Sequence, residues 1–167
     1  MLVLGVDPGT AITGYGLVRD APREGQLQAV AYGAITTPSD WALPQRLQKI
    51  YRDLSALIRE HGPAEGAVEQ LFFSRNVKTA LAVGQARGVV LLALADGGLA
   101  VHEYTPLQVK QSVVGYGRAE KTQVQELVRL LLGLKVRPQP DDAADALAIA
   151  ICHLHSARMM ALMESQT

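Results

Sequence analysis

The first part of the chain alternates short apolar stretches with turn residues, a pattern typical of neighbouring β-strands. We expect strands over residues 2–7, 13–20 and 26–37, separated by Pro8-Gly9-Thr10 and by the Ala-Pro-Arg-Glu-Gly segment at 21–25. Because the connections are short, the pattern predicts an antiparallel meander.

The remaining sequence changes to a helical period. Apolar residues at 43–61 recur every three or four positions and the run ends at Gly62-Pro63, which predicts an amphipathic helix. The later pattern predicts strands at 66–73 and 99–104 and helices at 76–96, 106–114, 119–132 and from Asp142 to about 163. The helix at 76–96 has many small and apolar residues and no wide polar face, so we expect it to be a core helix or to pair with a partner.

This order of elements predicts the fold. Three meander strands followed by alternating helices and strands favour an α/β architecture with a mixed five-stranded sheet flanked by helices. The order is that of the ribonuclease H-like fold, in which the first strand is central and the strand after the first helix lies beside it. We expect one such domain over residues 1–167.

The composition of the chain indicates a globular protein. The chain is 49% hydrophobic and 19% charged, which is ordinary for a globular domain and argues against disorder. The apolar run GVVLLALA is too short to span a bilayer and the first residues show no basic leader, so we expect a cytoplasmic protein without a membrane segment. The single Cys152 excludes an intrachain disulfide and a multi-cysteine zinc site, and we expect it in the core.

The formal net charge is zero, but the charges are unevenly distributed. Residues 71–95 contain three basic residues and no acid, and residues 104–140 contain six basic residues and two acids. Such a distribution indicates either a basic face that meets a polyanion or a solvated basic surface.

Four acidic residues have mainly aliphatic neighbours: Asp7, Glu69, Asp142 and Asp145. Burying a carboxylate costs several kcal/mol, to order of magnitude, unless a cation or donor compensates, so the group indicates a shared metal site. Oxygen ligands favour Mg²⁺ or Mn²⁺ over zinc. A pair of such ions is typical of phosphodiester hydrolysis.

Asp142 and Asp145 are three residues apart, so a helix places both on one face, whereas Asp141 is expected on another. An N-cap role would explain Asp141 or Asp142 equally well, but Asp145 lies inside the apolar helix and needs a partner. His153 and His155 are two residues apart and are expected on different faces, so we do not expect them to share a metal.

Five segments then point to a known family. GVDPGTAITGYG, AVEQLFFSRN, GQARGVV, QVKQSVVGYGRAEKTQV and DAADALAIAICH occur in this order, and together they resemble the RuvC family of bacterial Holliday junction endonucleases over nearly the whole chain. The resemblance implies a homodimer that cuts two same-polarity strands of a four-way DNA junction during recombination and repair. It also implies cooperation with the branch-migration proteins RuvA and RuvB.

The resemblance assigns roles to individual residues. The catalytic, metal-binding acids of the family match Asp7, Glu69, Asp142 and Asp145, with two Mg²⁺ or Mn²⁺ ions implied. Some members have His at the Asp142 position, so Asp142 either binds metal or positions water.

The resemblance also implies DNA contacts. Phe72 matches an aromatic residue that stacks on bases, although a core position is also open, and Lys110 and Lys121 match residues near the cleaved phosphate. Further candidates for phosphate contacts are Arg75, Lys78 and Arg118.

Two alternatives stay open. The first is a junction-binding protein without nuclease activity, which the complete set of acids disfavours. The second takes DPGTAITGYG as the phosphate-binding turn of an actin-like or sugar-kinase-type nucleotide-binding domain. Those proteins clamp a nucleotide between two domains, and this chain has the length of one.

Overall fold

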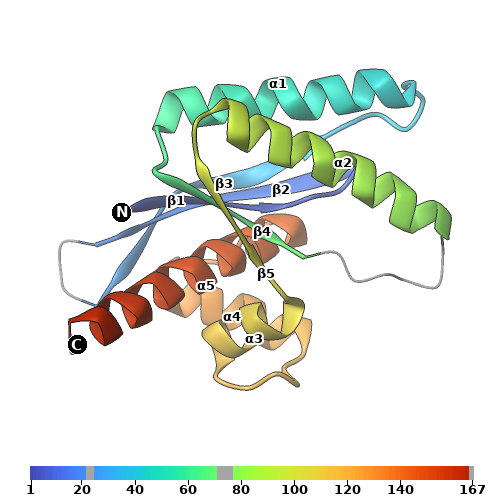
Figure 1. Cartoon of the computed structure of the whole chain (residues 1–167). Helices are drawn as coiled ribbons and strands as arrows, with labels where there is room; N and C mark the ends of the chain where they lie inside the picture. The colour runs from blue at the N-terminus through green and yellow to red at the C-terminus, as the bar shows by residue number, and fades with distance from the viewer. Residues whose placement is uncertain (22–24, 71–76, 166–167) are drawn as a thin grey trace.

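The computed structural model describes residues 1–21, 25–70 and 77–165 and contains a five-stranded sheet in the order β3-β2-β1-β4-β5 (Figure 1). The strands are β1 (Leu2–Asp7), β2 (Ile12–Asp20), β3 (Leu27–Thr36), β4 (Glu65–Glu69) and β5 (Ala100–Tyr104). The first three are antiparallel neighbours, whereas β4 pairs in parallel with both β1 and β5. The mixed sheet and the central first strand are therefore confirmed, and the fold is ribonuclease H-like.

Helices cover both faces of the sheet. On one face lie α1 (Leu43–His61) and α2 (Val77–Asp96), and on the other lies α5 (Asp141–Glu164) (Figure 1). The short helices α3 (Pro106–Val114) and α4 (Lys121–Leu131) pack against α5. Two hydrophobic cores result, one on each face of the sheet.

Two predicted boundaries differ from the structure by two residues or more, and one predicted helix cap is wrong. Strand β4 ends at Glu69 rather than at 73, and residues 71–76 lie outside the described chain. Helix α4 begins at Lys121 rather than 119, because Glu120 is the cap and its backbone N–H donates to the Gln123 side chain. Pro140 takes the N-cap position of α5, so the N-cap role considered for Asp141 or Asp142 is wrong. Both acids lie in the first turn, where the helix dipole favours negative charge.

Glycines in β1 and β2 let α5 approach the sheet closely. A Cβ atom on Gly5 would lie 2.1 Å from the carbonyl oxygen of Ala146, and one on Gly14 would lie 1.9 Å from that of Asp142. Since both obstacles are backbone atoms, no side-chain rotation would relieve the clash. These glycines therefore bring the first turns of α5 down onto the end of β1.

Helix α5 is long and apolar enough to cross a membrane by length and composition, but half of its apolar window is buried inside the domain. This burial is typical of a core helix in a globular protein. Its single cysteine, Cys152, is buried there, as the sequence predicts.

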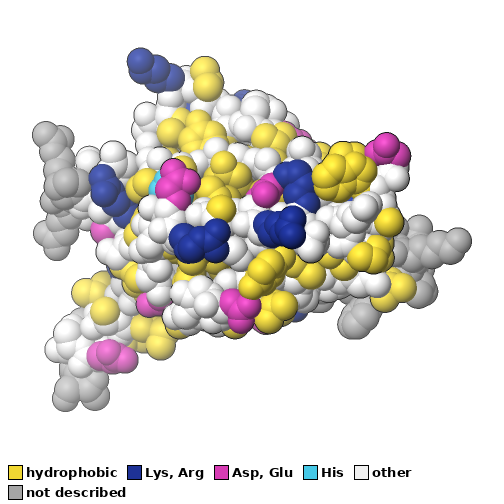
Figure 2. Space-filling view, turned by 90° about the horizontal axis from the view of Figure 1, so that it is seen from above, with side chains coloured by type: hydrophobic (Ala, Val, Ile, Leu, Met, Phe, Trp, Pro, Cys, Tyr) yellow, Lys and Arg dark blue, Asp and Glu magenta, His cyan; other side chains and the backbone are white. Residues whose placement is uncertain are grey.

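Helix α2 is apolar on both sides. Its inner side contributes Ala86, Val90 and Leu94 to the core, while Leu81 and Leu92 on the outer side are 62% and 53% exposed. Figure 2 shows the molecule from the side on which α1 and α2 lie, with hydrophobic side chains exposed among basic ones. On its outer side, this helix therefore exposes apolar side chains to solvent instead of a polar face.

Candidate active site

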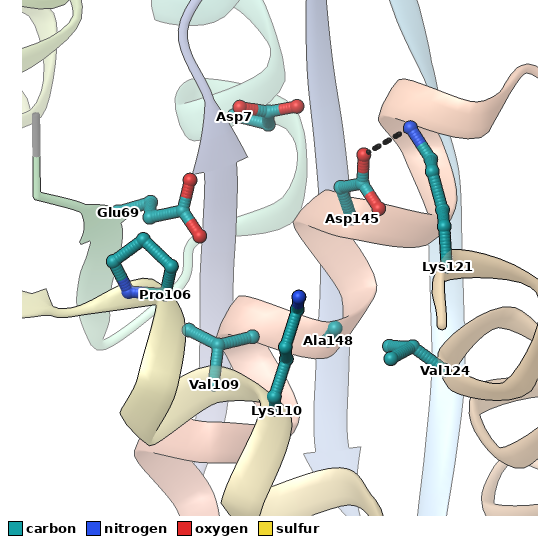
Figure 3. A pocket seen from close by; sticks show the side chains of 9 residues that line it. All are labelled: Asp7, Glu69, Pro106, Val109, Lys110, Lys121, Val124, Asp145 and Ala148. Atoms are coloured by element: carbon teal, nitrogen blue, oxygen red, sulfur yellow. Dashed lines mark ion pairs between the residues drawn. The ribbon is translucent and has the colours of Figure 1, made fainter. Parts of the chain in front are cut away.

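Three of the predicted acids meet at one end of the sheet. Asp7 is the last residue of β1, Glu69 is the last residue of the parallel neighbour β4, and Asp145 lies one turn into α5. The register explains the first two, because they directly follow the paired residues Val6 and Val68. Figure 3 shows the three carboxylates turned toward one pocket, which we call the acid pocket. Its lining consists of Asp7, Glu69, Pro106, Val109, Lys110, Lys121, Val124, Asp145 and Ala148.

Two lysines border the carboxylates. The Lys121 ammonium lies 2.9 Å from Asp145 Oδ2 and 3.7 Å from Asp141 Oδ2. Asp141 was expected on a different face from the other acids, but its position in the first turn of α5 still brings it to this lysine. Lys110, on α3, extends into the pocket from the side opposite Asp7 (Figure 3).

Burial and neighbouring negative charges disfavour the ionised forms of the acids in this pocket. Burial, followed by the charges of Asp145, Glu69 and Asp142, raises the pKa of Asp7 from 3.8 to about 7, although Lys121 acts in the opposite direction. Burial and the charge of Asp145 also raise the pKa of Glu69, which Lys110 partly offsets. The residues place more negative charge in a partly buried site than two lysines neutralise.

Asp145 and Lys121 influence each other. Burial raises the pKa of Asp145, and the hydrogen bond and charge of Lys121 only partly counteract this. Partial burial lowers the pKa of Lys121, but the hydrogen bond to Asp145 and the nearby acids outweigh it, so the net pKa is raised. Lys121 is therefore a fixed positive charge at the rim of the pocket at neutral pH.

Asp142 lies beside the acid pocket rather than in its lining. It lines an adjacent hollow with Gly9, Thr10, Arg46 and residues of α2. Its charge nevertheless raises the pKa of Asp7, so it belongs to the same electrostatic cluster. The structure thus places the Asp142 side chain in a hollow next to the one that the other three acids line.

The other residues that were predicted to contact DNA lie outside the acid pocket or outside the described part of the chain. Arg118 is exposed on the turn between α3 and α4 and does not line the acid pocket. Phe72 and Arg75 lie outside the described residues. Lys78 is in the first turn of α2, but its side chain also lies outside the described part.

Sequence reasoning missed Arg87, which holds the end of β4. Its guanidinium lies 2.7 Å from Glu103 Oε2, and its Nε donates to the backbone carbonyl oxygen of Glu69 at 3.5 Å. The Thr10 hydroxyl similarly donates to the carbonyl oxygen of Ala82 at 2.7 Å. Helix α2 therefore contacts the ends of the strands that carry the acids. An arginine in the middle of a mostly apolar helix is the signal that could have indicated this role.

The residues of the acid pocket fit a hard divalent cation. Carboxylates are the charged ligands that Mg²⁺ and Mn²⁺ prefer, and the lining residues that the structure describes include no His or Cys. The raised pKa values of Asp7 and Glu69 show that burial disfavours their charged forms, a cost that a bound cation would offset.

Comparisons with known proteins agree with this architecture. The family model of the crossover junction endodeoxyribonuclease RuvC matches residues 3–153. The chain is 57% identical over 165 residues to the enzyme of that name from Syntrophomonas wolfei, covering 99% of this chain and 95% of the relative. It is 61% identical over 156 residues to that from Heliobacterium modesticaldum, covering 93% and 95%.

A solved structure has the same fold as this chain. Thermus thermophilus RuvC in complex with Holliday junction substrate superimposes with a TM-score of 0.89 at 37% identity, covering 95% of this chain and 96% of that one. The fold and its acidic pocket place the chain in the ribonuclease H-like class. Within that class, it belongs to the RuvC family of crossover junction endodeoxyribonucleases.

Proposed function

We propose that this protein resolves Holliday junctions by hydrolysing two same-polarity strands in a divalent-metal-dependent reaction. The observation that carries the proposal is the convergence of Asp7, Glu69 and Asp145 with Lys110 and Lys121 in one pocket. The family match favours this activity over a nucleotide-binding domain and over a junction-binding protein without catalysis.

Asp7, Glu69 and Asp145 would hold the cations, with Asp142 as a further ligand or as the residue that orients water. The set suits Mg²⁺ or Mn²⁺, and we propose two ions in each site. Such ions supply activation of the attacking water and neutralisation of charge on the phosphate.

The protein's own contribution is orientation and charge. The parallel pairing of β1 and β4 keeps Asp7 and Glu69 side by side, and the close approach of α5 holds Asp145 against them. Lys110 and Lys121 place positive charge where a phosphate would approach the acids, which stabilises the additional negative charge of the transition state. A phosphate would compete with Asp145 for the Lys121 ammonium.

Further DNA contacts extend the proposal. Phe72 would stack on a base near the junction centre, and Arg75, Lys78 and Arg118 would contact phosphates away from the cut. These contacts position the DNA and carry no base sequence by themselves.

The proposed assembly is a homodimer. A four-way junction with two-fold symmetry needs two cuts, so a two-fold dimer places one acid pocket on each of two strands. The exposed outer face of α2, with Leu81 and Leu92, supplies apolar surface for such contact. We propose that each protomer is one nuclease domain of 167 residues, acting in the cytoplasm with RuvA and RuvB.

The test compares DNA substrates. Mobile and static four-way junctions and a linear duplex are incubated with protein and Mg²⁺ or Mn²⁺, and nicks are mapped on each strand. The proposal predicts paired nicks at symmetric positions in two same-polarity strands, and no cleavage of the duplex. Junction binding without nicks would favour the non-catalytic alternative, and equal cleavage of duplex would contradict structure selectivity.

The dimer has its own test. Leu92→Glu is expected to shift the protein from dimer to monomer in sedimentation and to lower paired nicking, whereas Lys135→Glu, at an exposed position remote from α2 in sequence, is the control. A dimer that persists at equal strength in Leu92→Glu would place the interface elsewhere.

A further inference from the structure

A second cluster of ligand side chains lies on the α5 face of the sheet, separate from the acid pocket. Glu65 begins β4, His102 is in β5 and His153 is in α5. One nitrogen of each ring and one Glu65 oxygen all lie within 4.8 Å of one another. Because Glu65 and Glu69 are four residues apart on one strand, this cluster lies about 13 Å along β4 from the acid pocket.

The two imidazoles converge on one oxygen. His153 Nε2 lies 2.8 Å and His102 Nε2 lies 2.7 Å from Glu65 Oε2, and the ring centroids are 4.3 Å apart. His153 is only 3% exposed, whereas the His102 side chain is 41% exposed. The cluster is therefore anchored in the core and open to solvent on one side.

One ring nitrogen of the cluster forms no hydrogen bond. Among the described side chains, His102 Nε2 is a buried nitrogen without a hydrogen bond, although it lies 2.7 Å from Glu65 Oε2. A cation among the three side chains would give this nitrogen a ligand bond.

His153 already has the second partner that metal-binding histidines need. Its Nδ1 lies 2.7 Å from the Tyr104 hydroxyl, which leaves Nε2 as the nitrogen that faces the cluster. Metal-binding histidines usually form such a bond through the other ring nitrogen, which fixes the ring orientation. His155 instead contacts the carbonyl oxygen of Ser112 and takes no part.

We propose that Glu65, His102 and His153 form a binding site for a transition-metal cation of the Zn²⁺ class. Two imidazole nitrogens and one carboxylate are a common zinc ligand set, whereas Mg²⁺ prefers oxygen ligands. At zinc–ligand bonds of about 2.0–2.2 Å in a tetrahedral site, the donor atoms must separate by roughly half an ångström from their present positions. Glu65 is 28% exposed and begins its strand, so its side chain has room to rotate.

The three side chains leave one position of a tetrahedral site for a fourth ligand. The Glu65 carboxylate and the outer edge of the His102 ring are partly exposed, and we infer that water takes the fourth position from that side. A bound ion would cross-link β4, β5 and α5, and α5 carries Asp145 two turns earlier. The inferred role is to hold α5 against the sheet, independently of whether the acid pocket cleaves junctions.

The test uses metal-free full-length protein, with Zn²⁺ in calorimetric titration and Co²⁺ as a spectroscopic probe. We expect one equivalent of Zn²⁺ to bind, tetrahedral Co²⁺ absorption, and a higher melting temperature. Glu65→Gln and His102→Gln, both at partly exposed positions, are each expected to weaken binding at least about tenfold, and Tyr104→Phe by about 10–100-fold. His155→Gln is the matched control that removes an imidazole outside the cluster and keeps wild-type affinity.

A triple variant separates the two sites. Asp7→Asn, Glu69→Gln and Asp145→Asn together remove the acid pocket, and the proposal requires the Zn²⁺ equivalent to persist in this protein. The proposal is overturned if Zn²⁺ does not bind saturably, if binding disappears in the triple variant, or if Glu65→Gln and His102→Gln bind as tightly as wild type.

Discussion

Replacing Asp7 with Asn should stabilise the metal-free protein at alkaline pH. Burial and neighbouring acids raise the pKa of Asp7 from 3.8 to about 7, so ionising it in the folded state is unfavourable. The folded protein retains the proton over a range in which the unfolded chain has lost it, and stability therefore falls as the pH rises from about 4 to about 7. Above this pH range, ionisation of Asp7 lowers the free energy of unfolding no further.

The magnitude follows from the two pKa values. At about 1.4 kcal/mol for each pKa unit, full ionisation of Asp7 costs the metal-free protein about 4 kcal/mol. Roughly 2–3 kcal/mol of this develops between about pH 5 and pH 8.5. Asn has nearly the same shape as Asp and no charge, so the free energy of unfolding of Asp7→Asn should show no such loss.

The assay is urea unfolding of wild type and Asp7→Asn in chelator at about pH 5 and pH 8.5. The advantage of the variant should grow by roughly 2–3 kcal/mol at the higher pH, and added Mg²⁺ should reverse it by stabilising only the wild type. Asp40→Asn, the same change at an exposed position, should stay within about 0.5 kcal/mol at both pH values. A difference between wild type and Asp7→Asn that does not change with pH would refute the reasoning.

Three other changes test separate parts of the architecture. Gly5→Ala should lower the free energy of unfolding by about 1–3 kcal/mol in urea and should also slow cleavage, because the new Cβ meets the backbone of α5. The control Gly88→Ala has open space around its Cβ and should be neutral or stabilising. Lys121→Gln should lower single-turnover cleavage about 100–1,000-fold while leaving junction binding nearly intact, and Lys135→Gln should cleave normally. Arg87→Gln should lower the cleavage rate about tenfold or more by freeing the end of β4, with unchanged circular dichroism; a wild-type rate would show that this contact is not needed.

Much of the fold could be predicted because local patterns are strong. Turn residues separate the meander strands, and the order of elements implies the central position of β1. That order also brings Asp7 and Glu69 to neighbouring strand ends, since parallel strands finish at the same edge. Asp145 could be predicted because a charge inside an apolar helix needs a partner.

Other features depend on tertiary geometry that no local pattern contains. Gly5 in β1 and Gly14 in β2 are visible in the sequence, but the helix backbone that they accommodate is more than 100 residues away. Glu65 and His153 are 88 residues apart and meet only through the strand register and the rotation of α5. The position of Asp141 beside Lys121 likewise depends on how α4 packs on α5.

The most direct test of the central claim measures cleavage and binding of one four-way junction by wild type and Glu69→Gln in Mg²⁺. Wild type should nick two same-polarity strands with Mg²⁺ and none in chelator. Glu69→Gln should bind the junction with near-wild-type affinity and cleave at least about a hundredfold more slowly. Cleavage by Glu69→Gln at the wild-type rate would contradict the assignment of the acid pocket as the catalytic centre.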